Sequence, residues 1–281
     1  MQQLPVRFIL DRAGLVGNDG ATHHGNYDLA YLGCIPDIVI MAPSDEIELQ
    51  NMIETAYEID NLPSAVRYPR GSGYGDEVLK DIFGHSGYLN GELPARGEPV
   101  PIGKGRLVKK GTNGRKYRAA ILSIGTKLVD SVRAARKLES TYPDLSVMVA
   151  DARFMKPLDE ALVRELATLN DVLITVEEGS KGGFGAHVLD FLTQEALLDK
   201  GTLRFRSMYI PDIWIEAGTQ PEQYNIAGLS EDHIIDKVAS VVDTMRDYRP
   251  KAILSGNSDI SHSVYSSSSS GSVATSYFRN G

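Results

Sequence analysis

Two arginines follow apolar runs that have the composition of β-strands. Arg12 ends the run FILDR, and Arg70 ends the run AVRYPR. If the two strands are parallel, both guanidinium groups reach the same edge of the sheet, where open α/β sheets bind ligands. Two arginines at one edge suit a phosphate, which each can hold bidentately. Solvated surface arginines are the commoner arrangement, but Pro69 and Gly71 beside Arg70, and Asp11 beside Arg12, favour an anion site.

Further polar residues lie in the glycine-rich stretch GNDGATHHG that follows the first arginine. Asp19 fits a turn that its own side chain stabilises and fits a functional carboxylate equally well. His23 and His24 are adjacent, so they point apart, and neither has the spacing of a zinc ligand. A stretch of this kind after a strand favours a role for one of the two histidines in binding or catalysis. We therefore expect no metal site here.

Strands that alternate with helices must position these residues. The apolar periodicity predicts an α/β fold with two doubly wound domains. The expected strands span 6–10, 37–43, 64–69, 118–125, 145–151, 171–178 and 204–211. The expected helices follow Ser44, Thr126 and Ser230 as N-caps, begin near Pro157, and follow the turn EEGSKGGFGAH, in which Lys181 is expected to be exposed.

The composition divides the chain into four parts. Residues 1–75 are expected to form the first domain, 76–104 a linker with a surface insertion, and 105–247 the second domain. The region 248–281 is rich in serine and is expected to be disordered.

Charge and hydropathy exclude several classes of partner. The 281 residues carry a net charge of −8, which argues against nucleic acid and against an acidic membrane surface. No apolar run is long enough to span a membrane, and the N-terminus lacks the features of a signal or transit peptide. The single cysteine, Cys34, lies in an apolar run and is expected to be a buried thiol.

Several motifs occur in an order that resembles the 1-deoxy-D-xylulose-5-phosphate synthase family. They are DRAGLVGNDGATHHGNYDLAYLGCIPDIVIMAPSDE, PSAVRYPRG, PIGKG, DARFMKPLDE, VEEGSKGGFGAHV and IPDIWIEAGTQ. The resemblance covers about residues 1–247 and implies the pyrimidine-binding domain, partial at its N-terminus, and the C-terminal domain of a transketolase-type enzyme.

The resemblance implies a transferase that joins pyruvate to glyceraldehyde 3-phosphate, with loss of carbon dioxide, on thiamine diphosphate and Mg²⁺. The product feeds isoprenoid (terpenoid) and thiamine biosynthesis. By the same resemblance, Arg12 and Arg70 hold the phosphate of the acceptor. His23 donates a proton or a hydrogen bond, and Asp19 orders the substrate and the histidine.

The chain also departs from the family. The Gly-Asp-Gly…Asn motif for magnesium and diphosphate is absent, and the glutamate that activates the cofactor belongs to a stretch before residue 1. We therefore expect no cofactor or metal ligands in this chain, and expect it to be a fragment that is inactive alone and a homodimer at full length. A plastid location is expected for a photosynthetic eukaryote, and a cytoplasmic one otherwise.

Two other functions stay open. The β subunit of a 2-oxoacid dehydrogenase decarboxylase pairs the same two domains, although it carries the activating glutamate. A truncated relative could instead persist as a non-catalytic binding module.

Overall fold

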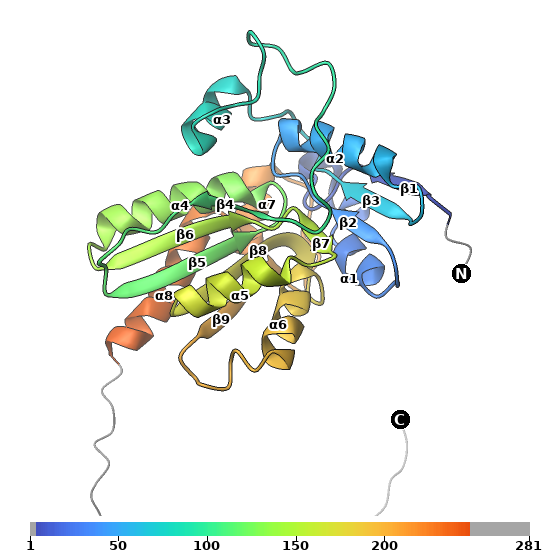
Figure 1. Ribbon diagram of the computed structural model, residues 1–281. Coiled ribbons are helices and arrows are strands. Elements are labelled where there is room, and N and C mark those ends of the chain that lie inside the picture. Colours follow the sequence, from blue (N-terminus) through green and yellow to red (C-terminus); the bar gives the residue numbers. More distant parts are fainter. Residues whose placement is uncertain (1–3, 248–281) are drawn as a thin grey trace, which may run out of the picture. The chain divides into compact units, whose positions relative to one another are not determined.

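The computed structural model describes residues 4–247 (Figure 1). The region 248–281, where the sequence predicts disorder, lies outside the described residues. The strands are β1 (Arg7–Leu10), β2 (Val39–Met41), β3 (Ser64–Arg67), β4 (Arg106–Lys109), β5 (Tyr117–Ser123), β6 (Leu145–Asp151), β7 (Phe154–Lys156), β8 (Val172–Ser180) and β9 (Arg204–Ile210). The α-helices are α1 (Asp28–Gly33), α2 (Glu46–Glu58), α3 (Asp76–Phe83), α4 (Lys127–Thr141), α5 (Glu160–Leu169), α6 (Phe184–Gln194), α7 (Gln220–Ala227) and α8 (Glu231–Arg246).

The first sheet has the strand order β1-β3-β2-β7. β3 is parallel to both β1 and β2, with Arg7 opposite Ser64 and Leu10 opposite Arg67. This register brings the ends of β1 and β3 to the same edge, as the sequence predicts for the segments that carry the two arginines. The fourth strand, β7, comes from the second half of the chain and is antiparallel to β2.

The second sheet has the strand order β4-β6-β5-β8-β9. Its central strands are parallel, and β4 is antiparallel to β6 at one edge. Helices α4 and α8 pack against each other and on one face, and α5 and α6 pack together on the other (Figure 1). The sheet is thus covered on both faces, which is typical of doubly wound folds.

Buried apolar residues form three clusters that connect the two sheets. One lies between the second sheet and helices α4 and α8, and another lies between the first sheet and α2. The third joins Ile40 and Ala65 of the first sheet to Ala120 and Leu122 of the second. The two halves therefore share a core, and the described residues belong to one compact unit.

The predicted fold class is confirmed. The strands β4 and β7 were not among the strands that the sequence predicts. Both are only three or four residues long, and both are antiparallel to their neighbours. Each joins its sheet by pairing with a strand from a distant part of the sequence, and such pairing leaves no local signal. The boundaries expected at residues 75 and 104 stay predictions.

The region 76–104 is more ordered than a linker. It contains the amphipathic helix α3, and residues 94–100 lie on α2 as a strap. Asn51 accepts a hydrogen bond from the backbone of Glu98 at 2.8 Å, and Thr55 accepts one from Val100 at 2.8 Å. The sequence-based interpretation missed these contacts because they join residues more than 40 positions apart.

Several N-caps differ from those expected. Asp45 caps α2 in place of Ser44, and Asp159 caps α5, which begins after Pro157. Thr126 precedes α4, but its side chain makes no cap hydrogen bond. Ser230 is the N-cap of α8, and its hydroxyl contacts the Nδ1 atom of His233 rather than the backbone.

Cys34 corrects another prediction, because its thiol is exposed rather than buried. It follows the short helix α1 and contacts the carbonyl oxygen of Tyr31 at 3.0 Å. The apolar run around it is divided between α1 and β2, so its residues do not share one buried face. Lys181 is exposed, as expected.

Candidate functional site

The carboxylate of Asp19 joins the two arginines that follow β1 and β3. Its Oδ2 atom lies 3.4 Å from Nε of Arg12 and 3.0 Å from Nε of Arg70. Arg12 also contacts Asp11 at 2.5 Å. The structure thus brings together three of the four residues that the sequence singles out.

Both guanidinium groups remain accessible to a ligand. The side chains of Arg12 and Arg70 are 45% and 44% exposed, whereas that of Asp19 is 27% exposed. Two half-exposed guanidinium groups that converge on one carboxylate can bind an anionic ligand such as a phosphate through charge-assisted hydrogen bonds. Asp19 contacts both guanidinium groups and holds them together.

The backbone that carries these residues has an unusual conformation. Arg12 has a positive φ of 59°, and Gly14, Gly17 and Gly20 also have positive φ values. Gly14 and Gly25 exchange two backbone hydrogen bonds, of 2.8 and 3.0 Å, and so close the loop between them. A non-glycine residue in this conformation costs free energy, and such residues cluster at functional sites.

The structure does not join His23 to the other three residues. Its ring is exposed, and its Nδ1 atom lies 2.9 Å from the hydroxyl of Thr22. Among the described residues, none of its hydrogen bonds or ion pairs reaches Asp19 or either arginine. A role for His23 stays a prediction.

His24, by contrast, connects the loop to the second half of the chain. Its Nδ1 atom accepts a hydrogen bond from the backbone N–H of Val16 at 3.2 Å, and its Nε2 atom lies 2.9 Å from the carbonyl oxygen of Ile215. These two contacts are satisfied together by the neutral ring with its proton on Nε2. The sequence holds no signal for this role, because Val16 and Ile215 are recognised only through the fold.

A buried ion pair lies beneath the loop. Arg67 binds Asp28 at 2.6 Å, and both side chains are more than nine-tenths buried. The same guanidinium donates to the carbonyl oxygens of Gly25 at 3.1 Å and Glu178 at 2.9 Å. Removing one partner of such a pair leaves an uncompensated buried charge, which is strongly destabilising. The sequence-based interpretation missed Arg67 because it lies inside a strand.

Two consecutive glutamates near the end of β8, Glu177 and Glu178, accept hydrogen bonds from residues in or next to the neighbouring helices. The carboxylate of Glu178 accepts hydrogen bonds from Tyr224 at 2.8 Å and from Thr126 at 2.5 Å. Glu177 accepts from the backbone N–H groups of Phe184 and Gly185 at the start of α6. Burial raises the pKa of Glu177 to about 7, although these two N–H donors oppose the shift.

A cavity of about 590 Å³ adjoins Arg70 and lies between the two halves. This volume is in the range of small-molecule sites. Residues of both halves line it, among them Glu46, Arg70, Tyr74, Lys127, Gln220 and Tyr224. The carboxylate of Glu46 accepts hydrogen bonds from the backbone of Tyr74 and Gly75 and from the hydroxyl of Tyr88, so it holds the segment after Arg70.

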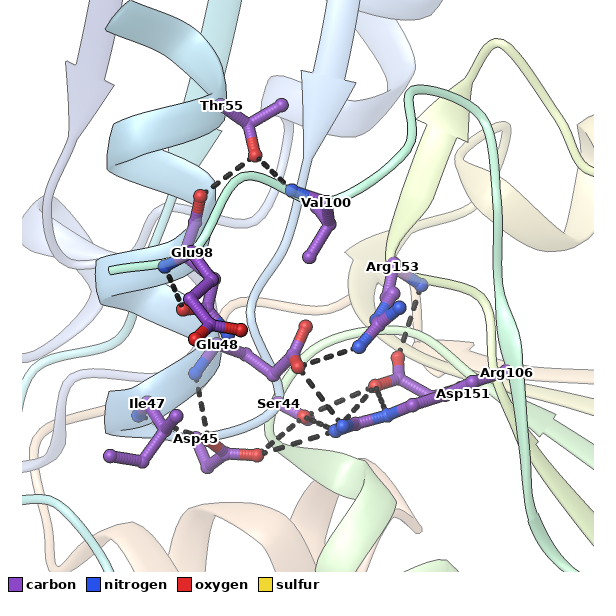
Figure 2. Close-up of polar contacts among 11 residues, drawn as sticks. Ser44, Asp45, Ile47, Glu48, Thr55, Glu98, Val100, Arg106, Asp151 and Arg153 are labelled. Carbon is purple, nitrogen blue, oxygen red and sulfur yellow. Dashed lines mark hydrogen bonds and ion pairs between the residues drawn. The ribbon is translucent and has the colours of Figure 1, made fainter. Parts of the chain in front are cut away.

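A cluster of charged side chains connects the two halves at the start of α2 (Figure 2). Arg106 contacts Glu48 at 2.9 Å, Asp151 at 3.2 Å and Asp45 at 3.6 Å, and Arg153 contacts Glu48 at 2.7 Å. Burial raises the pKa of Asp45, and it raises the pKa of Asp151 to about 6. Burial opposes the charged form of Arg106, but the three carboxylates around it raise its pKa overall. The cluster therefore holds the end of β6 against α2.

The described residues hold neither a candidate metal cluster nor a candidate membrane span. Within residues 4–247, histidines, cysteines and carboxylates nowhere gather in a group of three or more that could hold a metal ion. In the same part of the chain, every helix is too short or too polar to cross a membrane.

Comparisons with known proteins match both halves. Residues 1–74 match the model of the transketolase pyrimidine-binding domain, and residues 104–234 match that of the transketolase C-terminal domain. A solved structure described as a split-gene transketolase, an inactive β4 tetramer, is similar with a TM-score of 0.64 and 22% sequence identity. The similarity covers 85% of this chain and 66% of that one, so this chain spans slightly less than two thirds of the length of the solved structure.

Proposed function

This chain carries the pyrimidine-binding and C-terminal domains of transketolase-type thiamine-diphosphate enzymes, and on this premise we propose that it supplies the acceptor site of a 1-deoxy-D-xylulose-5-phosphate synthase. The proposed reaction condenses pyruvate with glyceraldehyde 3-phosphate and releases carbon dioxide. The observation that carries the proposal is the convergence of Arg12 and Arg70 on Asp19 at the edge of the first sheet.

In the proposed complex, the phosphate of the acceptor lies between the two guanidinium groups. Each arginine can direct a planar pair of N–H donors at the phosphate oxygens, which fixes both the position and the orientation of the aldehyde. Asp19 contacts the Nε atoms and so keeps the two arginines aligned. We assign to the exposed His23 a hydrogen bond to the oxygen of the reacting carbonyl group, where negative charge develops.

We propose that the described residues do not supply the site for the metal-bound diphosphate of the cofactor. This rests on the resemblance, because the Gly-Asp-Gly…Asn motif for magnesium and diphosphate does not occur in this sequence. We propose that another part of the enzyme, on the same polypeptide or on a partner, binds the cofactor, and that the described part is inactive without it.

The first test measures binding of D-glyceraldehyde 3-phosphate to the full chain by titration calorimetry. We expect Arg70→Ala and Arg12→Ala each to weaken binding at least tenfold, because each loses about 1.5–3 kcal/mol of charge-assisted hydrogen bonding. Arg70→Lys keeps the charge but loses the planar fork, so we expect an intermediate loss. Arg164→Ala is the matched control, since Arg164 is also 44% exposed and pairs with Glu195 outside the site.

Equal affinities in the wild type, Arg70→Ala and Arg164→Ala would overturn the acceptor site. Formation of deoxyxylulose phosphate from pyruvate and glyceraldehyde 3-phosphate, after addition of a diphosphate-binding domain, would support the full reaction. Formation of that product by the described part without such a domain would contradict the proposed dependence.

The β subunit of a 2-oxoacid dehydrogenase decarboxylase is the second candidate, because the same pair of domains is compatible with it. That function needs no phosphorylated aldehyde as acceptor. Failure of the wild type to bind glyceraldehyde 3-phosphate, together with association with an α subunit, would favour it.

A further inference from the structure

One side chain of the second half connects the two segments that carry the arginines. Gln220, the first residue of α7, donates through Nε2 to the carbonyl oxygen of Leu15 at 2.8 Å and to that of Arg70 at 3.0 Å. Leu15 lies three residues after Arg12. A single amide group therefore sets the separation between the backbone after β1 and the backbone after β3.

A second glutamine on the same helix holds the loop near Asp19. Gln223 is buried, and its Oε1 atom accepts a hydrogen bond from the N–H of Gly17 at 2.7 Å. Its Nε2 atom donates to the carbonyl oxygens of Gly17 and Glu216, both at 2.9 Å. Both backbone hydrogen-bonding groups of Gly17 are thus paired with the side-chain amide of Gln223. Gly17 lies two residues before Asp19.

The segment that carries the two glutamines is itself held in place. Thr219 and Glu222 form a capping box at the start of α7, with reciprocal hydrogen bonds between side chain and backbone. Ile215 accepts the contact from His24, and Ala217 lies against Gly20. Residues 215–223 therefore contact the loop at several points along its length.

The loop needs such support because little regular structure holds it. Arg12, Gly14, Gly17 and Gly20 have positive φ values, and only two short 3₁₀ turns, 17–19 and 21–23, lie within it. The arginine side chains are half-exposed and long, so the position of their backbone decides whether both can reach one phosphate.

We propose that Gln220 and Gln223 are positioning residues that set the separation of Arg12 and Arg70 and so match the anion site to a phosphate monoester. The identity of the ligand rests on the proposed function, whereas the positioning of the arginines does not. The C-terminal domain thereby takes part in substrate binding through α7, although neither glutamine contacts the phosphate.

The test compares the 281-residue chain with its Gln220→Ala and Gln220→Glu variants. The first readout is the affinity for inorganic phosphate and for glyceraldehyde 3-phosphate, measured by titration calorimetry. We expect both ligands to bind about tenfold more weakly, because the hydrogen bonds to the carbonyl oxygens of Leu15 and Arg70 are lost. Gln50→Glu is the matched control, since Gln50 also lies on a helix and donates at 3.0 Å to a backbone carbonyl, that of Pro94, outside the site.

The second readout needs no ligand. The Nε–H resonances of Arg12 and Arg70 report their contacts with Asp19, so we expect them to shift and broaden in Gln220→Ala and to stay unchanged in Gln50→Glu. A purely structural role of Gln220 would lower stability without moving these two resonances selectively.

Unchanged resonances and unchanged affinities in both Gln220 variants would overturn the positioning role. If the wild type binds neither phosphate nor glyceraldehyde 3-phosphate while the resonances still respond to Gln220→Ala, the positioning role stands and the proposed acceptor site fails. The two results therefore separate this inference from the proposed function.

Discussion

Gly14 shows how closely the site loop packs against the second half of the chain. Its φ is 74°, and a Cβ atom added there would lie 2.5 Å from Oε1 of Glu178. We expect Gly14→Ala to lower the free energy of unfolding by about 2–5 kcal/mol, from backbone strain of about 1–2 kcal/mol and overpacking of about 1–3 kcal/mol. Urea denaturation followed by circular dichroism measures this loss.

Gly114 provides the control for that change. Its φ is 76°, but a Cβ atom there would meet nothing within 4 Å. Gly114→Ala should therefore lose only the strain, about 1–2 kcal/mol. Equal losses at the two glycines would show that the contact with Glu178 has no energetic effect.

Glu177 makes stability depend on pH in a predictable direction. Burial raises its pKa in the folded state to about 7, above the ordinary value of 4.5, so the folded protein binds this proton more tightly than the unfolded chain. The contribution of Glu177 is therefore fully present below pH 4.5 and is lost as the pH rises to about 7. Relative to Glu177→Gln, we expect the wild type to lose about 3 kcal/mol across this window.

The comparison with the variant is needed because other groups titrate in the same window. Burial and Lys156 lower the pKa of His187, which makes stability rise with pH below 6.5. His187 is unchanged in Glu177→Gln, so its effect cancels in the difference between the two proteins. Urea denaturation at several pH values from 4.5 to 7 gives that difference, and parallel curves for the two proteins would contradict the assignment.

At the scale of elements, the strap on α2 explains how the region between the two halves is ordered. A Cβ atom on Gly97 would collide with the backbone of Gln50 on α2, so the strap can lie this close only with glycine at this position. We expect Gly97→Ala to lift the strap and to release the backbone beside the already exposed Arg96, with tryptic cleavage after Arg96 at least several-fold faster than in the wild type. Limited proteolysis with mass spectrometry identifies the cut.

Gly91 lies in the same region and provides the matched control. Its φ is positive, at 82°, but a Cβ atom there would meet nothing within 4 Å. Gly91→Ala should therefore leave cleavage after Arg96 close to the wild-type rate. Similar rates in both variants would indicate that loop strain, rather than contact with α2, controls access.

At the scale of the whole molecule, the two halves depend on each other through β7. Phe154 belongs to the second half but is fully buried in the cluster that contains Val39, Met41 and Val66 of the first sheet. We expect Phe154→Ala to lower the free energy of unfolding by about 3–5 kcal/mol and to speed amide exchange in β2 and β3. Hydrogen exchange with mass spectrometry locates the effect.

Leu138 on α4 is the comparison residue for that experiment. It is also fully buried, but it lies in the cluster between α4, α8 and the second sheet. Leu138→Ala should speed amide exchange mainly in β5 and β6, because amides that exchange through local opening report on the part of the structure that is weakened. If Phe154→Ala left exchange in β2 and β3 unchanged, the first sheet would not depend on the second half of the chain.

The sequence by itself determined the features that depend on local spacing. Periodic apolar residues predict the long central strands and helices, and a parallel sheet then brings the ends of β1 and β3 together. This is why the convergence of Arg12 and Arg70 could be anticipated. The same reasoning missed β4 and β7, because their places in the sheets depend on antiparallel pairing with distant strands. It misplaced Cys34 because its apolar run is divided between two elements.

Only the tertiary structure decided what holds the site in place. Gln220 and Gln223 contact backbone groups more than 200 residues away, and His24 contacts Ile215 across 191 positions. Arg67 and Asp28 form an ion pair inside the protein, although charged residues of these types usually lie on the surface. Such contacts follow from the packing of the two sheets against each other, and packing between distant segments leaves no periodic signal in the sequence.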